Sequence, residues 1–131
     1  MSAAPRPGLL RAAPYLPTSD VDAAVTYYEE TLGFGREYVA GTPAQFAIVS
    51  RDGHPVMLRR VADPGLIRAS PAQGGTWDVF FWVSDADGLF EELVGRGAEA
   101  VYGPIVQEAY GMKEFAVRAP DGHVLGFGES L

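Results

Sequence analysis

The two histidines of this chain, His54 and His123, are its first candidates for acid–base or metal chemistry, because imidazole titrates near neutral pH and binds transition metals. Each follows an Asp-Gly pair, in the segments FAIVSRDGH (46–54) and FAVRAPDGH (115–123). Both segments fit FA(I/V)xxxDGH, at an offset of 69 residues. Because the repeat places both histidines at the same point after a turn, we interpret them as turn residues that are structural or face solvent.

Three charged residues on predicted strands could also take part in chemistry. Asp78 lies within the aromatic run WDVFFW (77–82), and Glu114 and Arg118 lie on the predicted strand 113–119. A carboxylate can act as a general base, and a guanidinium can stabilise an enolate or an oxyanion. Such an aromatic run can also be a strand buried on both faces, although a buried strand does not favour a carboxylate within it.

A second repeat indicates which elements position these residues. SDVD (19–22) recurs as SDAD (84–87) at an offset of 65 residues, each time where an apolar strand meets a helical pattern. Asp20 is a suitable N-cap, and Gly33 is placed to end the helix that follows. Apolar residues recur with a helical period in both copies: Val21, Ala24, Val25, Tyr28 and Leu32, then Ala86, Leu89, Phe90, Leu93 and Val94.

Each copy therefore predicts a βαβββ module. The expected strands are 11–18, 35–40, 44–51 and 55–61 in the first copy, and 77–83, 99–102, 113–119 and 124–128 in the second. Asp52-Gly53 and Asp121-Gly122 predict tight hairpins, because that turn type needs positive φ. We expect an α+β fold with one domain over 1–131: module one at about 9–62, a linker at 63–75 with a helical turn at 66–69, and module two at about 76–131.

Alternation along the strands predicts which side chains face a groove between modules. One helix covers one face of each sheet, so the other face needs a partner, from the same chain or from the second chain of a homodimer. The predicted groove positions are Ala13, Tyr15, Pro17, Gln45, Ala47, Val49, Met57, Arg59, Asp78, Phe80, Trp82, Glu114, Ala116, Arg118, Gly126 and Gly128, with Tyr38 at the edge. Tyr110 either stacks over this groove or fills a turn.

Composition excludes several classes of function. The 131 residues include no cysteine, which rules out disulfides, zinc–thiolate and iron–sulfur sites and a cysteine nucleophile, and favours a cytoplasmic location. The 10 basic and 17 acidic residues give a formal charge of −7 without a basic cluster, so we expect no nucleic-acid partner. The start of the chain has prolines at positions 5, 7 and 14 and no long apolar run, so we expect no signal peptide and no membrane partner. The acidity suits a neutral or cationic small ligand, or serves solubility alone.

Three segments resemble the vicinal oxygen chelate superfamily, which includes glyoxalase I, extradiol dioxygenases, fosfomycin-resistance enzymes and bleomycin-resistance proteins. They are PYLPTSDVDAAVTYYEETLGF (14–34), VSDADGLFEELVGRGAE (83–99) and YGMKEFAVRAPDGHVLGF (110–127). The resemblance implies paired βαβββ modules. It also implies, for the catalytic members, a divalent metal held by His and Glu side chains on the first and last strands of each module.

The metal-ligand positions that the resemblance implies are Ala13, Met57, Asp78 and Gly126 in this chain. Only Asp78 offers a suitable donor, whereas a catalytic divalent ion usually needs about three protein ligands. We therefore expect no metal and no other cofactor.

By this resemblance, the chain is expected to be a metal-independent binding protein of bleomycin-resistance type, which sequesters an antibiotic or another aromatic or cationic compound without bond chemistry, in a groove formed across a homodimer. The candidate ligand-binding residues are Tyr15, Tyr38, Met57, Arg59, Asp78, Phe80, Trp82, Tyr110, Glu114 and Arg118. Two alternatives stay open. One is a lyase- or isomerase-type enzyme that uses Asp78 or Glu114 as a base, with or without a metal, and the other is an interaction module whose groove is filled by side chains.

Overall fold

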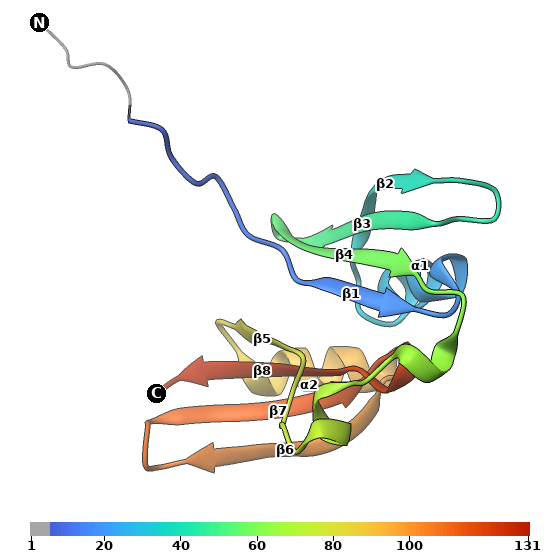
Figure 1. Cartoon of the computed structure of the whole chain (residues 1–131). Helices are drawn as coiled ribbons and strands as arrows, with labels where there is room; N and C mark the ends of the chain where they lie inside the picture. Colours follow the sequence, from blue (N-terminus) through green and yellow to red (C-terminus); the bar gives the residue numbers. More distant parts are fainter. Residues whose placement is uncertain (1–5) are drawn as a thin grey trace, which may run out of the picture.

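The duplicated sequence folds into two modules that are stacked one above the other (Figure 1). The computed structural model describes residues 6–131, so Pro5 of the proline-containing start lies outside the described residues. Module one consists of β1 (Tyr15–Thr18), α1 (Val21–Glu30), β2 (Gly35–Ala40), β3 (Phe46–Arg51) and β4 (His54–Arg60). Module two consists of β5 (Val79–Trp82), α2 (Ala86–Gly95), β6 (Glu99–Gln107), β7 (Met112–Arg118) and β8 (Val124–Ser130).

Each module contains a four-stranded sheet of the same topology. The strand orders are β1-β4-β3-β2 and β5-β8-β7-β6. The first strand of each module runs parallel to the last strand, and the other neighbours are antiparallel. The predicted α+β fold of two βαβββ modules is therefore confirmed.

The first helix begins at the predicted cap, Asp20, and the second begins at the matching residue of the repeat, Asp85. Asp20 accepts a hydrogen bond from the Ala23 N–H at 3.0 Å, and Asp85 accepts one from the Gly88 N–H at 3.0 Å. Each carboxylate thereby satisfies a first-turn N–H that has no partner within its helix. The inner face of α1 buries the predicted stripe Val21, Ala24, Val25 and Tyr28. Among residues 6–131, no helix is long and apolar enough to cross a membrane.

Several predicted edges differ from the structure, among them that of β5, which begins at Val79 instead of residue 77. β1 begins at Tyr15 instead of residue 11, and its pairing with β4 starts at Met57. β6 continues to Gln107, because its pairing with β7 resumes at Ile105 after an irregularity that contains Gly103 with a φ of +72°. The linker forms two short 3-10 turns, η1 (Pro64–Leu66) and η2 (Ser70–Gln73), on either side of the predicted one.

The connection between the last two strands is one residue longer in module two. In module one, Arg51 pairs with His54 around Asp52-Gly53, and both turn residues have positive φ, as predicted. In module two, Arg118 pairs with Val124, and inside this pair the Ala119 N–H donates to the His123 carbonyl oxygen at 2.7 Å. The loop therefore consists of the three residues of the 3-10 turn η3 (Pro120–Gly122), against two residues in module one. A tight hairpin is the wrong prediction there, since proline has no N–H with which to extend the ladder.

This extra residue displaces β7 by one position relative to β3, although the FA(I/V)xxxDGH letters match. Ala47 lies opposite Leu58 in module one, whereas Phe115 lies opposite Phe127 in module two. A displacement of one residue turns every side chain to the other face of a sheet. The matching letters therefore mark opposite faces: Phe115 is fully buried, and its counterpart in the motif, Phe46, is only half-buried.

The groove-facing prediction for β3 is wrong for this reason. Ala47 and Val49 have no exposed surface and pack in the core. Ile48 lies opposite Met57, so its side chain shares the face of that methionine, and Phe46 shares the face of Arg59. Gln45 precedes β3 and donates a hydrogen bond to the Pro43 carbonyl.

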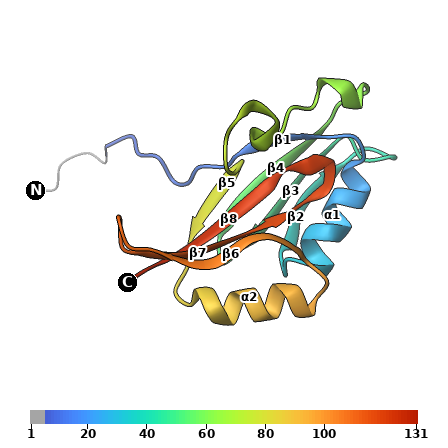
Figure 2. The same cartoon turned by 90° about the horizontal axis from the view of Figure 1, so that it is seen from below.

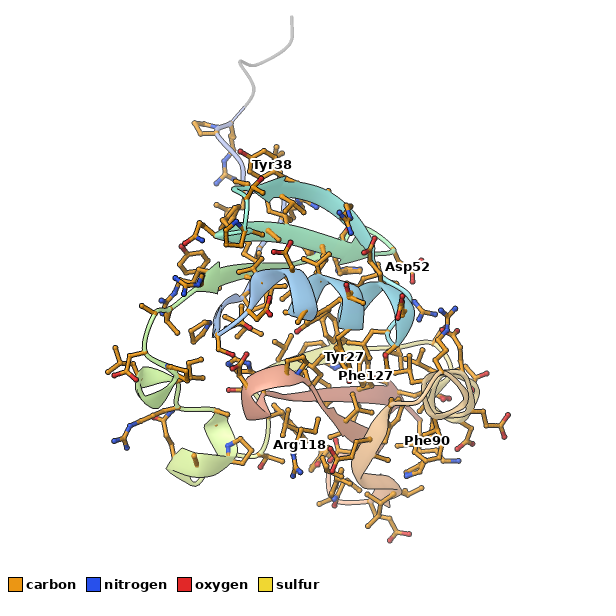
Figure 3. The ribbon with its side chains drawn as sticks, turned by 90° about the vertical axis from the view of Figure 1, so that its right-hand side faces the viewer. Tyr27, Tyr38, Asp52, Phe90, Arg118 and Phe127 are labelled. Atoms are coloured by element: carbon orange, nitrogen blue, oxygen red, sulfur yellow. The ribbon has the colours of Figure 1, made fainter. Side chains whose placement is uncertain are left out.

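One continuous core joins the two modules. Figure 3 shows α1 between the sheet of module one and the strands β7 and β8. The Tyr27 hydroxyl donates to the Arg118 carbonyl oxygen at 2.9 Å, and the Phe34 and Phe81 rings lie 6.2 Å apart. Burial raises the pKa of Tyr27 to about 12, with a further contribution from Glu99. The modules therefore contact each other on their helix side, which leaves the opposite face of each sheet without a helix.

Asp121 fastens module two to the end of β1. Its carboxylate accepts hydrogen bonds from the Thr18 hydroxyl at 2.5 Å, the Ser19 hydroxyl at 2.7 Å and the Ser19 N–H at 3.2 Å. Burial by itself raises the pKa of Asp121, but these hydrogen bonds outweigh it and lower the pKa below its ordinary value. A carboxylate with a lowered pKa stabilises the fold above its ordinary pKa and loses that contribution as the pH falls through the lowered value.

We predict that Asp121→Asn lowers the free energy of unfolding by about 1–3 kcal/mol at pH 7, because hydrogen bonds to a charged group are lost. Asparagine tolerates the φ of +65° at this position. In urea denaturation, the difference from the parent protein shrinks when the pH falls below about 4. The matched control is Asp52→Asn, at an exposed turn residue with a φ of 51°, which should change stability by less than about 0.5 kcal/mol. An equal effect of the two variants contradicts the prediction.

Candidate ligand-binding groove

The helix-free face of the second sheet carries most of the predicted aromatic site. Phe80 lies opposite Gly126, and Trp82 lies opposite Gly128, which in turn lies opposite Glu114. Opposed residues share a face, so Phe80, Trp82 and Glu114 all project to the side that α2 does not cover. The alternate residues Val79 and Phe81 pack against the core instead.

Two glycines of β8 allow the aromatic rings to lie close to the sheet. A Cβ atom at Gly126 would lie 2.9 Å from Phe80 Cδ2 and 2.9 Å from Trp77 Cε3. A Cβ atom at Gly128 would lie 2.5 Å from Phe80 Cζ and 2.7 Å from Met112 Cε. Any larger residue would push these rings away from the strand, so the glycines form the floor of the site.

The rings surround a hollow of about 440 Å³. Its walls are formed by Trp77, Phe80, Trp82, Tyr110, Met112 and Glu114. The Trp77 and Phe80 ring centroids lie 4.8 Å apart, and Phe80 meets Trp82 edge to face at 5.1 Å. Trp82 is 74% exposed and Tyr110 is 57% exposed, although both are large amphipathic rings. The hollow is therefore open and aromatic, which contradicts the alternative of a groove filled by side chains.

Glu114 is the one carboxylate in this hollow, and it is only 2% exposed. Its Oε1 atom accepts hydrogen bonds from the Tyr110 hydroxyl at 2.7 Å and the Tyr102 hydroxyl at 3.0 Å. Gln107 donates to the Tyr102 hydroxyl in turn. The hydrogen bond to Glu114 is the main cause that raises the pKa of Tyr110 to about 12. Burial is the main cause that raises the pKa of Tyr102. Both phenols therefore stay protonated and hold the carboxylate in place.

A second aromatic group lies on the helix-free face of module one. The Tyr15 and Phe46 rings lie 6.2 Å apart, and Tyr38 lies 6.1 Å from Phe46 on the other side. The Arg59 guanidinium lies 5.4 Å from the centre of the Tyr15 ring, in a cation–π arrangement. Met57 pairs with Tyr15 in the parallel ladder and is half-buried beside it. Tyr15 and Tyr38 are each 55% exposed.

Asp78 does not present a free carboxylate to the groove. Its Oδ1 accepts from the Ser70 N–H at 2.8 Å, and its Oδ2 accepts from the Val124 N–H at 2.8 Å. Both oxygens thus tie the linker to the start of β8. The residue lies just before β5, so the alternation expected from the strand pattern does not place its side chain.

Arg118 lies at the other end of β7 from the aromatic hollow. It forms an ion pair with Glu99 at 3.1 Å, and its side chain is 50% exposed. It borders a separate hollow of about 320 Å³ with Tyr102, Ala116 and residues of the linker. Glu114 and Arg118 are therefore not brought together around one guest.

The family's metal positions do not fit a metal in this chain. Ala13, Met57 and Gly126 offer no nitrogen or oxygen side-chain donor, and both oxygens of Asp78 accept backbone hydrogen bonds. Within residues 6–131, no three His, Asp or Glu side chains are grouped so that they could hold a metal ion. Of the histidines, His54 is exposed at its hairpin, and His123 is 4% exposed with Nδ1 at 3.2 Å from the Pro120 carbonyl oxygen.

The structure thus divides the ten predicted site residues into three groups. Phe80, Trp82, Tyr110 and Glu114 meet at the hollow of module two; Tyr15, Tyr38, Met57 and Arg59 line the face of module one; Asp78 and Arg118 lie outside both. The structure adds five residues that were not among the predicted site residues: Trp77, Phe46, Met112, Tyr102 and Gln107. Met112 could have been found, because it has the same strand parity as Glu114.

Comparison with models of known protein families identifies one family that matches this chain. The sequence model of the Glyoxalase/Bleomycin resistance protein/Dioxygenase superfamily matches residues 8–127. A search of curated protein sequences gives no significant match.

Among solved structures, TioX from Micromonospora sp. ML1 is 27% identical with a TM-score of 0.73, over 92% of this chain and 98% of TioX. The bleomycin-binding protein from bleomycin-producing Streptomyces verticillus, complexed with copper(II)-bleomycin, is 27% identical with a TM-score of 0.68, over 93% of this chain and 97% of that protein. A glyoxalase-related enzyme from Clostridium phytofermentans has a TM-score of 0.76 at 19% identity, over 95% of this chain and 97% of the enzyme, and shows the shared fold alone.

We predict that Gly126→Val displaces Trp77 and Phe80 from the floor of the hollow. Because overpacking of a tight site costs about 1–3 kcal/mol, the free energy of unfolding should fall by that amount in urea denaturation. The tryptophan emission should shift as the Trp77 ring moves. Gly35→Val is the matched control, because a Cβ atom at that strand glycine meets nothing within 4 Å. Unchanged stability and emission in Gly126→Val would show that the rings do not rest on the glycine.

Proposed function

The chain belongs to the Glyoxalase/Bleomycin resistance protein/Dioxygenase superfamily, and we propose that it is a metal-independent small-molecule-binding protein. Its guest is an antibiotic or another aromatic or cationic compound, which it sequesters without breaking or forming bonds. A guest held by an abundant protein is withdrawn from its target by mass action, as in resistance by sequestration.

The observation that carries this proposal is the open aromatic hollow on the second sheet. Exposed aromatic rings that surround a cavity are typical of small-molecule sites, where flat faces provide contact area and a few polar groups fix orientation. Trp77, Phe80, Trp82 and Tyr110 supply such faces, and Glu114 supplies the polar group. The likeness to a bleomycin-binding protein at 27% identity supports the same reading.

The alternative of a lyase- or isomerase-type enzyme has less support. A general base needs a carboxylate that can reach the proton it removes. Asp78 uses both oxygens for backbone hydrogen bonds. Glu114 lines the hollow, but Arg118, the group expected to stabilise an oxyanion, does not line it and is paired with Glu99. No step is therefore assigned to these residues.

We propose that a second copy of the chain packs against the helix-free faces of the two sheets. Each sheet leaves its helix-free face open, with Tyr15 at 55% and Trp82 at 74% exposed. Figures 1 and 2 both show the start of the described chain running away from the sheets, and Leu9 and Leu10 in this segment are almost completely exposed. Apolar surface of this extent favours association, so we propose a homodimer in which module one of one chain faces module two of the other.

We predict sedimentation of the purified protein at twice the mass of the chain. Replacing Leu9 and Leu10 together by Ser should shift the protein toward the monomer, because two exposed apolar side chains are removed from the contact. Leu66→Ser, at a linker residue that is 73% exposed, is the control and should leave the mass unchanged. A parent protein that is monomeric at all concentrations contradicts the dimer.

We predict that protein treated with a metal chelator still binds its guest. Bleomycin and a panel of planar aromatic antibiotics should include at least one compound that raises the melting temperature and gives calorimetric heat. Trp82→Ala should weaken that binding by about 1–3 kcal/mol, since a stacked ring is lost at the edge of the hollow. Leu66→Ala should bind as the parent does. If no compound gives a thermal shift or heat, the proposal fails.

A further inference from the structure

The two oxygens of Glu114 have different surroundings. Oε1 accepts both phenol hydrogen bonds, from Tyr102 and Tyr110, and no hydrogen bond to Oε2 occurs within residues 6–131. In that same range, no fully buried side-chain oxygen lacks a partner, so Oε2 keeps access to the hollow that Glu114 lines. The hydrogen-bond acceptor that a guest meets in this aromatic hollow is therefore the Oε2 atom of Glu114.

The two basic residues of β7 form ion pairs with acidic residues other than Glu114. Lys113 forms an ion pair with Asp87 at the start of α2, and Arg118 forms one with Glu99 at 3.1 Å. Neither of these cations lines the hollow. The negative charge of Glu114 is thus held by neutral phenols and is not compensated by a neighbouring cation within the described residues.

A guest that fills the hollow removes the remaining water from Oε2. A neutral guest without a donor, or an anion, would leave a desolvated carboxylate oxygen without a partner, which is strongly unfavourable. A cationic N–H group pairs with Oε2 and at the same time lies against aromatic faces that attract cations. The formal charge of −7 attracts the same class of guest.

From this arrangement we infer that the hollow binds an organic ammonium or guanidinium group attached to a flat apolar body. Glu114 Oε2 is the anchor for the N–H group, and Trp77, Phe80, Trp82 and Tyr110 are the walls around the apolar body. Tyr102 and Gln107 are positioning residues, because they act on Oε1 and on each other. The inference rests on the proposed function and names the class of ligand for that site.

Three probes of the same shape and different charge test the inference: 2-naphthylmethylammonium, 2-naphthylmethanol and 2-naphthoate. The chain has two tryptophans, and both line the hollow, so their two indole N–H signals in a proton–nitrogen NMR spectrum report on this site. Titration should shift both signals. We expect the ammonium probe to bind at least about tenfold more tightly than the alcohol, and the carboxylate probe to bind most weakly.

Glu114→Gln keeps the size of the side chain and removes the charge. It should reduce the preference for the ammonium over the alcohol to within about twofold, while the alcohol binds as before. Glu91→Gln, at an exposed glutamate of α2, is the matched control and should retain the full preference. If Glu114→Gln does not fold, the order of the three probes on the parent protein decides alone.

Equal binding of the ammonium and the alcohol by the parent protein overturns the inference and leaves the proposed function standing. An ammonium preference that survives in folded Glu114→Gln overturns the role of Glu114. If none of the three probes moves the indole signals up to its solubility limit, while a compound of the antibiotic panel still raises the melting temperature, the charge inference is wrong and the binding function is not. Failure of both the probes and the panel overturns both.

Discussion

A single helix can cover only one face of a four-stranded sheet, and this constraint determines where the molecule can bind anything. Both modules turn their helix-covered faces toward a shared core, with α1 between them and contacts such as Tyr27 to Arg118 and Phe34 to Phe81 across the junction. The packing leaves one open face on each sheet. Those faces carry exposed rings such as Tyr15 and Trp82, and Asp121 keeps the two faces in a fixed relation by accepting hydrogen bonds from Thr18 and Ser19.

Patterns of period and turn chemistry predicted the elements well. The repeated SDxD motif marked both helix starts, and the apolar stripe of α1 was found residue by residue. The repeat gave a wrong prediction for the face of β3, because the strand pairing differs by one residue between the two modules. The loop that contains Pro120 is one residue longer, so Phe46 and Phe115 face opposite ways although both begin an FA(I/V)xxxDGH motif. The motif alone does not reveal this displacement before the strand pairing is known.

The site could be predicted only where it lies on regular strands. Phe80, Trp82 and Glu114 follow from alternation, because β5 and β7 are regular at these positions. Trp77 and Asp78 lie before β5 begins, so alternation gave no orientation for Trp77 and a wrong expectation for Asp78, whose carboxylate binds two backbone N–H groups. The Tyr102–Gln107 pair depends on the irregular course of β6, which the sequence does not reveal.

The paired strands of the two modules distribute bulk in opposite ways. In module one the pairs are Tyr15 with Met57 and Pro17 with Arg59, whereas in module two they are Phe80 with Gly126 and Trp82 with Gly128. In module two the first strand carries the large side chains and the last strand carries glycines. In module one the first and last strands both carry sizeable side chains. Because these positions lie on the helix-free faces, the different distribution changes the open surface while the parallel strand pairing is the same in both copies. In a duplicated scaffold, one copy can therefore present a different open surface through the residues of two neighbouring strands, while the other copy keeps its own.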